Sequence, residues 1–119
     1  MCQKAGGAPL AFADVPTEAF VVTRGALATF RSSEIAERGF CAACGTPLTY
    51  RLLGGGHTEV TLGSFDDTNA VAPILQYGVE SRVRWLAEAL AAPATRIDEW
   101  LAGKKIASVG GRQHPDHET

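Results

Sequence analysis

Hydrophobic and polar residues alternate over several short stretches of this chain. The clearest is residues 58–62, in which Val60 and Leu62 alternate with Glu59 and Thr61. A period of two is typical of a strand that buries one of its faces. The pattern therefore predicts a half-buried β-strand at this position.

Further strands are expected on both sides of this one. Residues 18–32 are rich in β-branched and aromatic side chains and are interrupted at Arg24-Gly25, which predicts two short strands. Other segments of similar composition are bounded by glycine and proline. We expect strands at residues 35–40, 47–53 and 74–79, and a hairpin turn at Gly54-Gly55-Gly56.

Helical patterns are confined to the C-terminal part. Residues 85–91 form one short helical patch, and residues 97–102 form a second that Gly103 ends. We therefore predict a mainly antiparallel β domain with short helices only after residue 84. Trp85 is expected to be substantially buried, because its aromatic area is the largest available to packing there.

The composition fits one domain of ordinary size. The chain has 119 residues, of which 45% are hydrophobic and 20% charged. We expect a folded domain over residues 1–103 and a polar, disordered tail over residues 104–119. A net charge of −2 without a basic cluster argues against nucleic-acid binding. No apolar run approaches the roughly 18 residues of a membrane span, and nothing marks a signal peptide, so we expect a cytoplasmic protein.

Cysteine spacing supplies the main chemical signal. Cys41 and Cys44 form a C-x-x-C turn that Gly45 follows. This spacing is typical of half of a four-ligand zinc site, but also of a redox dithiol. A redox dithiol needs a helix N-terminus at its first thiol, whereas a strand-like segment follows here. We favour zinc ligands in a tight turn whose backbone N–H groups point at the sulfurs, with a redox dithiol or two inert thiols as alternatives.

The remaining cysteine is Cys2, so the chain has three cysteines in total. Structural zinc usually takes four ligands in two close pairs, and three cysteines do not make two pairs. A functional interpretation has to account for this incomplete ligand set.

Four segments of the chain form a recognisable series of motifs. They are residues 2–9 (CQKAGGAP), 38–48 (RGFCAACGTPL), 63–67 (GSFDD) and 81–86 (SRVRWL). Their order resembles the glutathione-dependent formaldehyde-activating (GFA), or centromere protein V-like, family, and the resemblance covers roughly residues 1–86.

The resemblance implies a fold and a metal content. The fold would be an Mss4-like β-tent, in which several small antiparallel sheets are held by zinc. Members of this family carry a structural zinc site, in which Cys41 and Cys44 would be two ligands. They also carry a catalytic zinc site built from a C-x-C-x-x-C run, whose last cysteine matches Cys2.

This chain departs from the family at its N-terminus, because the first two cysteines of that run and a preceding cysteine pair do not occur in it. A histidine that is frequent in the family is replaced by Gln76 or Tyr77. We expect Met1 to be an internal codon of a longer reading frame, which upstream genomic sequence would test.

The activity that the resemblance implies is carbon–sulfur bond chemistry on thiol–aldehyde adducts. The substrates would be a small thiol such as glutathione and formaldehyde, which form S-hydroxymethylglutathione. Because Cys2 alone would hold zinc weakly, we expect impaired activity and sub-stoichiometric zinc. The alternative is a non-catalytic, zinc-supported structural or binding module. Two chains pooling Cys41 and Cys44 at a homodimer interface would be another way to complete a zinc site.

Other polar residues have both functional and structural interpretations. Arg82 and Arg84 would bind the carboxylates of a glutathione-like ligand, or are ordinary surface charges. Gly7 would let the backbone pass close to a metal or ligand. For Asp66-Asp67 we favour a turn over a paired-carboxylate site.

The remaining candidates are weaker. We interpret Trp85 and Trp100 as packing residues and not as a binding platform. His57 follows three glycines and is expected to be solvated. His114 and His117 have a spacing that would chelate a metal, but they lie in a proline-broken tail, which is not a preformed site.

Overall fold

The computed structural model describes residues 2–107, without the side chain of Cys2. The chain divides into two compact units between Val83 and Arg84. His114, His117 and most of the expected tail lie outside the described residues.

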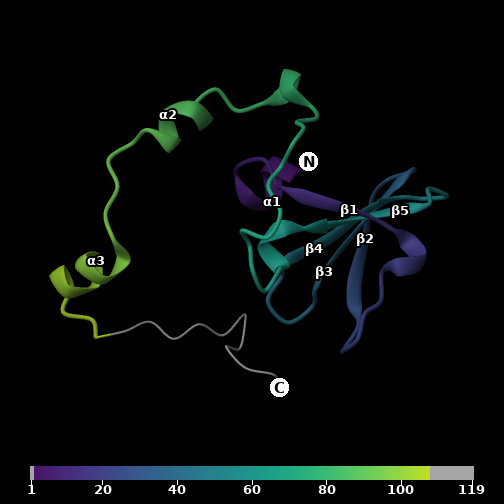
Figure 1. The fold of residues 1–119 in the computed structure, drawn as a ribbon, viewed down its shortest axis with the longest axis horizontal. Coiled ribbons are helices and arrows are strands. Elements are labelled where there is room, and N and C mark those ends of the chain that lie inside the picture. The colour runs from purple at the N-terminus through teal and green to yellow at the C-terminus, as the bar shows by residue number, and fades with distance from the viewer. Residues whose placement is uncertain (1, 108–119) are drawn as a thin grey trace. The chain divides into compact units, whose positions relative to one another are not determined.

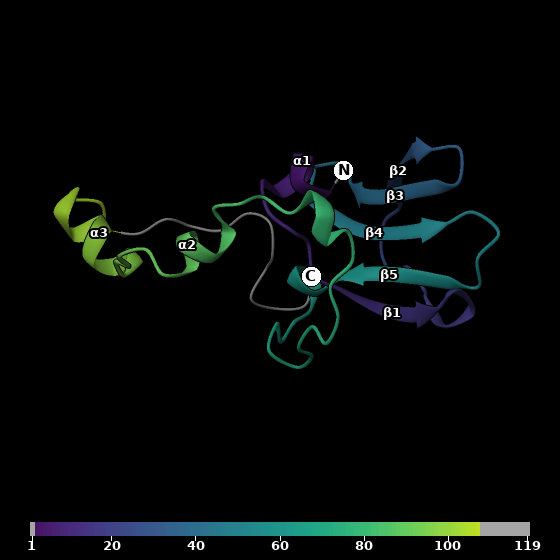
Figure 2. The same ribbon diagram turned by 90° about the horizontal axis from the view of Figure 1, so that it is seen from above.

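The first unit is built on one antiparallel sheet, so the expectation of a mainly β, antiparallel domain is confirmed. Figure 2 shows its strands side by side in the order β1-β5-β4-β3-β2. The described residues place the strands in a single sheet, where the family resemblance suggested several small ones. The strands are β1 (Phe12–Pro16), β2 (Leu27–Ser33), β3 (Ala36–Cys41), β4 (Pro47–Leu52) and β5 (His57–Thr61).

The central hairpins agree with the sequence. The strands expected at residues 35–40, 47–53 and 58–62 correspond to β3, β4 and β5. The three-glycine turn joins β4 to β5, and its first residue, Gly54, has a φ of 78°. Only glycine adopts this left-handed conformation without steric cost, which is why a glycine cluster predicts the turn.

Two strand predictions were wrong and one strand was missed. Residues 74–79 form no strand but an exposed connection, in which Ile74 is 97% exposed and Gly78 is left-handed. The first half of residues 18–32 is irregular, and only β2 forms there. The sequence pattern does not predict β1, because this strand is short and ends at Pro16. Its pairing with β5 determines its conformation, and a composition-based prediction does not contain that information.

Helices are not confined to the region after residue 84, which corrects a further prediction. A five-residue helix, α1 (Cys2–Gly6), begins the described chain (Figure 1). Gly7 ends it with a φ of 71°, and the Gly7 N–H donates to the Gln3 carbonyl at 2.7 Å. This is the usual way in which a left-handed glycine closes a helix. Single-turn 3₁₀ helices occur at Thr17–Ala19, Leu62–Ser64 and Val79–Ser81.

The second unit contains the two helices that the sequence predicted, α2 (Leu86–Leu90) and α3 (Ile97–Gly103). Trp85 precedes α2 and is 49% exposed, so the expectation that it is substantially buried was wrong. Trp100 of α3 is exposed to the same extent. Two helices of five and seven residues offer too little surface to enclose an indole ring. Within residues 2–107, the helices are all too short or too polar to cross a bilayer.

Buried side chains in the sheet unit are few, and several of them are hydroxyl-bearing. Of the side chains described in that unit, Ala36 and Leu62 are the buried apolar ones. Thr58 and Thr61 are also buried; the Thr61 hydroxyl donates to the Pro47 carbonyl at 2.9 Å. This bond ties the end of β5 to the start of β4, directly beside the cysteine turn.

Candidate functional site

Cys41 and Cys44 lie in a tight turn between β3 and β4. The Gly45 N–H donates to the Cys41 carbonyl at 2.7 Å, and the Cys41 N–H donates to the Thr46 carbonyl at 2.9 Å. Gly45 has a φ of 77°, which explains a glycine after the second cysteine. The turn is therefore held by its own backbone.

Both thiols are free, and that of Cys44 is exposed. The Thr46 hydroxyl lies 3.0 Å from the Cys44 sulfur. Hydrogen bonds from the Thr46 side chain, then from the Thr46 N–H, then from Cys41 lower the pKa of the Cys44 thiol, while its slight desolvation acts the other way. Hydrogen bonds that favour a thiolate have this effect.

The surroundings of the turn differ from those of a thioredoxin-like redox dithiol. The residues after Cys44 enter strand β4, and no helix begins there. The helix dipole that stabilises the first thiolate of a redox dithiol does not occur at this position. Two thiolates are half of a tetrahedral zinc set.

The N-terminal helix and the end of the first unit meet at a second location. The Gln3 side-chain amide donates to the Ser81 carbonyl at 2.7 Å, across 78 positions of sequence. Cys2 precedes Gln3, and Arg82 follows Ser81. The fold therefore brings the segment that carries Cys2 close to the segment that carries Arg82, two of the candidates identified in the sequence.

Arg82 itself is exposed and lies in extended backbone. Its guanidinium donates to the Gln76 side-chain oxygen at 3.2 Å, a neutral acceptor that leaves the positive charge available to an anion. Tyr77, which the resemblance places with Gln76 at a position that is often histidine, is 89% exposed. Gly7 has no atom within 4 Å of the place where a Cβ would lie, and its observed role is to end α1.

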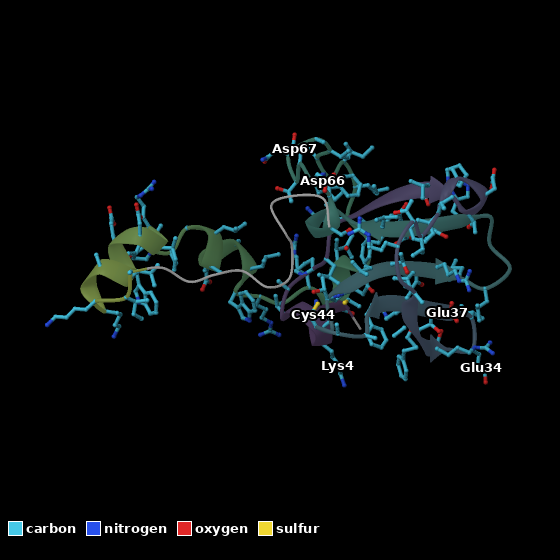
Figure 3. The ribbon with its side chains drawn as sticks, turned by 90° about the horizontal axis from the view of Figure 1, so that it is seen from below. Lys4, Glu34, Glu37, Cys44, Asp66 and Asp67 are labelled. Carbon is cyan, nitrogen blue, oxygen red and sulfur yellow. The ribbon has the colours of Figure 1, made fainter. Side chains whose placement is uncertain are left out.

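Asp66 and Asp67, the carboxylates of the GSFDD segment, lie apart from the cysteine turn. Asp67 accepts a hydrogen bond from the Asn69 N–H at 2.9 Å, which supports the predicted turn over a paired-carboxylate site. In Figure 3, Asp66 and Asp67 lie apart from Cys44, on the other side of the same end of the sheet. They do not join the sulfurs in one site.

His57 is exposed, as expected, but it has a partner. Its Nδ1 lies 2.9 Å from an Asp14 carboxylate oxygen. Asp14 lies opposite Glu59 in the pairing of β1 with β5. This pairing collects charged side chains on one face of the sheet, away from the cysteine turn.

Metal-ligand residues do not gather into larger groups. Among the described residues, no three His, Cys, Asp or Glu side chains are placed to hold a metal ion together. Within this part of the chain, Cys41 and Cys44 are therefore a candidate pair and not a complete ligand set. The sequence pattern did not single out Gln3 or Thr46. A threonine two positions after Cys44 was a usable signal for a hydroxyl beside the sulfur. The contact of Gln3 with Ser81 depends on the fold and has no local signal.

Comparison with known proteins gives one match. A family model described as "Glutathione-dependent formaldehyde-activating enzyme" matches residues 1–81. Neither the curated proteins nor the solved structures gave a match. The matched range contains α1, the whole sheet, the cysteine turn and the Ser81 end of the Gln3 contact.

Proposed function

This chain belongs to the glutathione-dependent formaldehyde-activating enzyme family, and on that premise we propose that it binds a small thiol such as glutathione and acts in carbon–sulfur bond chemistry on its formaldehyde adduct. The observation that carries the proposal is the Gln3–Ser81 hydrogen bond, which brings together the segments of Cys2 and Arg82. The family match extends over both residues of this contact.

The reaction is an addition. The thiolate sulfur attacks the carbonyl carbon of formaldehyde, one carbon–sulfur bond forms, and the carbonyl electron pair moves to oxygen, which takes up a proton. The product is a hemithioacetal, S-hydroxymethylglutathione when the thiol is glutathione. The reverse reaction breaks the same bond, which is the lyase direction. A protein assists by holding the thiol and by favouring its thiolate form.

Arg82 is the residue that we assign to thiol binding. Glutathione carries two carboxylates, and a guanidinium binds a carboxylate through paired hydrogen bonds. The contact of Arg82 with Gln76 orients the side chain without neutralising it. Gly7 would leave the backbone beside α1 open to a ligand, since nothing occupies the space next to its Cα.

Zinc is the metal that the resemblance implies. We propose Cys41 and Cys44 as ligands of its structural site and Cys2 as a ligand of its catalytic site. When bound, zinc would hold a sulfur as thiolate. The described residues complete neither a structural nor a catalytic set. A catalytic zinc needs about three protein ligands and one open position, which Cys2 alone does not provide. We therefore expect this chain to bind a thiol even though its catalytic activity is impaired.

Thiol binding is tested by the substitution Arg82→Gln. Loss of a charge-assisted hydrogen bond to a carboxylate costs about 1.5–3 kcal/mol, which corresponds to a roughly tenfold or greater rise in the Kd for glutathione. NMR titration of the labelled chain measures this Kd. Arg31→Gln is the matched control, because Arg31 is exposed and bonded to the Glu34 carbonyl at the opposite end of the sheet. Equal affinities of the two variants would refute the role of Arg82.

The same preparations test catalysis. We expect thiol–formaldehyde addition close to the uncatalysed rate, followed by NMR exchange spectroscopy with and without added zinc. A zinc-dependent acceleration that disappears in Cys2→Ser would show that Cys2 supports more chemistry than we propose.

The alternative function is a non-catalytic binding or structural module. The observation that favours it is the ligand pair without a third partner among the described residues. Binding of glutathione without acceleration of the addition would agree with this alternative. We place either function in the cytoplasm, where thiols remain reduced.

A further inference from the structure

One face of the sheet carries a row of side chains that crosses all five strands, in the order in which Figure 2 shows them. Directly opposed residues of antiparallel strands place their side chains on the same face. Four such pairs follow one another from β1 to β2: Asp14↔Glu59, Glu59↔Tyr50, Tyr50↔Arg38 and Arg38↔Phe30. The row therefore begins with two carboxylates, has a phenol ring at its centre, and continues with a guanidinium and a second ring. We call this side of the sheet the Tyr50 face.

The chain itself covers the opposite face of the sheet. β1 and β2 run in the same direction at the two edges, so residues 17–26, which join them, return along one face. Thr17, at the start of this connection, has its hydroxyl oxygen 3.1 Å from that of Thr58. Thr58 is buried and alternates with Glu59 along β5, so it lies on the side opposite the Tyr50 face.

The Tyr50 face carries apolar side chains that remain accessible. Within the described residues of the first unit, no helix packs extensively on this face, because the extensive contacts are those between neighbouring strands. Phe30 is 62% exposed, and Leu52, two positions after Tyr50 and hence on the same face, is 49% exposed. The rings of Phe12 and Tyr50, with centres 6.4 Å apart, form an aromatic pair across β5. The face thus combines aromatic and aliphatic surface with an ordered row of charges.

The order of the charges along this row is complementary to itself. A two-fold axis along β4, at the centre of the row, turns one sheet over onto a second copy and exchanges its two sides. Glu59 of each copy then faces Arg38 of the other, and the two Tyr50 rings meet on the axis. An axis at right angles to the strands would instead set each carboxylate against the same carboxylate of the other copy, which is unfavourable. The charges therefore select the first arrangement.

The geometry of packed sheets allows these contacts. Two sheets that pack face to face lie about 10 Å apart with their strands nearly aligned, a gap that an arginine and a glutamate side chain bridge together. The Arg38 guanidinium carbon already lies 5.0 Å from the centre of the Tyr50 ring, so its charge is held over the face.

We propose that the Tyr50 face is a homodimer interface in which Arg38 and Glu59 of one copy pair with Glu59 and Arg38 of a second copy. The inference goes beyond the proposed function, because it involves none of the cysteines and not Arg82. Five strands about 4.8 Å apart and about five residues of about 3.3 Å each give roughly 400 Å² of flat area per copy. Two such faces lie at the small end of specific interfaces, so the dimer is weak and forms at high protein concentration.

Sedimentation equilibrium of the purified 119-residue chain, in reducing buffer with a chelator, measures the association over a concentration series. We expect a monomer–dimer equilibrium that added sodium chloride shifts towards the monomer, because salt screens the ion pairs. NMR signals of Tyr50 and Phe30 should move with concentration, whereas those of Thr58 on the opposite face should not. A chain that stays monomeric at every concentration, or a dimer that needs zinc, would refute the interface.

Charge-reversal variants identify the surface. Arg38→Glu and Glu59→Arg each set like charges against each other across the axis, so each variant alone should dimerise roughly tenfold or more weakly. An equimolar mixture of the two should associate again, because every carboxylate in the mixed dimer faces a guanidinium. Recovery on mixing also separates a lost contact from a lost fold, which circular dichroism of each variant checks.

The matched control is Arg31→Glu, a charge reversal next to Phe30 in β2 but on the opposite face of the sheet. It should dimerise as the unsubstituted chain does. Unchanged association of Arg38→Glu, folded variants that fail to associate on mixing, or loss of the dimer in Arg31→Glu would overturn the inference.

Discussion

At the scale of single residues, Glu59 shows how strand pairing sets the behaviour of a carboxylate. Glu59 lies opposite Asp14 of β1 on one side and Tyr50 of β4 on the other. Its partial burial, and then the charge of Asp14, raise the pKa of Glu59, while Arg38 opposes the shift. Arg38 also covers the Tyr50 ring, with its guanidinium carbon 5.0 Å from the ring centre.

The raised pKa predicts the sign of a pH effect. A carboxyl group with a higher pKa in the folded state favours folding most when it is protonated. Its contribution is complete below the ordinary glutamate pKa and is lost as pH rises through the raised value. Glu59→Gln should therefore stabilise the sheet at neutral pH. At pH values above the ordinary glutamate pKa, the urea midpoint of this variant should also depend less on pH.

The control for this prediction is Glu34→Gln, in the exposed turn between β2 and β3. It makes the same carboxylate-to-amide change at an exposed position, so it measures the effect of the substitution itself. A carbon-13 titration that gave Glu59 an ordinary or lowered pKa would contradict the assignment.

At the scale of elements, the close approach of β3 to β4 depends on a residue without a side chain. Gly39 is buried and pairs with Thr49. A Cβ at Gly39 would overlap the Thr49 hydroxyl and would lie 3.1 Å from a Leu27 methyl group. The pairing of β3 and β4 becomes irregular directly after this point, where the chain enters the cysteine turn. Gly39 thus allows the central strands to pack where the turn begins.

Gly39→Ala should destabilise the sheet by about 1–3 kcal/mol, the usual cost of inserting a methyl group into a packed site. Urea unfolding followed by circular dichroism measures the change. Gly63→Ala is the matched control, since no atom lies within 4 Å of its added methyl group. The double variant Gly39→Ala/Thr49→Ala should lose less stability than the two single changes summed, because the two sites are in contact. Strict additivity would argue against the overlap.

At the scale of the whole molecule, the two tryptophans report on one unit. Trp85 and Trp100 both lie after Val83, and the sheet unit contains no tryptophan. Each indole is 49% exposed. Partly exposed indoles emit at longer wavelengths than buried ones, so unfolding changes their environment little.

We therefore expect a small red shift of tryptophan emission on urea unfolding, and ready quenching by acrylamide in the native chain. Trp85→Phe and Trp100→Phe, measured separately, assign the signal to each ring. A strongly blue-shifted emission from either variant would mean that the remaining indole is enclosed in the native protein.

Several features followed from the sequence because their causes are local. The cysteine turn needs a C-x-x-C spacing and a left-handed glycine, and Gly45 supplies the latter. The three-glycine hairpin and the alternation in β5 have equally local causes. The turn at Asp67 follows from the tendency of an aspartate side chain to accept a hydrogen bond from a nearby backbone N–H. The Asn69 N–H donates such a bond to Asp67.

Tertiary structure decided what depends on distant partners. Residues 74–79 have the composition of a strand but form none. A β-strand needs a neighbouring strand whose backbone N–H and C=O groups form hydrogen bonds with its own. β1 has a weak pattern and forms nevertheless, since β5 pairs with it. The Gln3–Ser81 contact joins residues 78 positions apart. The sequence by itself thus determined the cysteine spacing and the turn that holds both cysteines, whereas the fold alone decided which segments lie beside the segment of Cys2, because pairing and packing depend on residues far away along the chain.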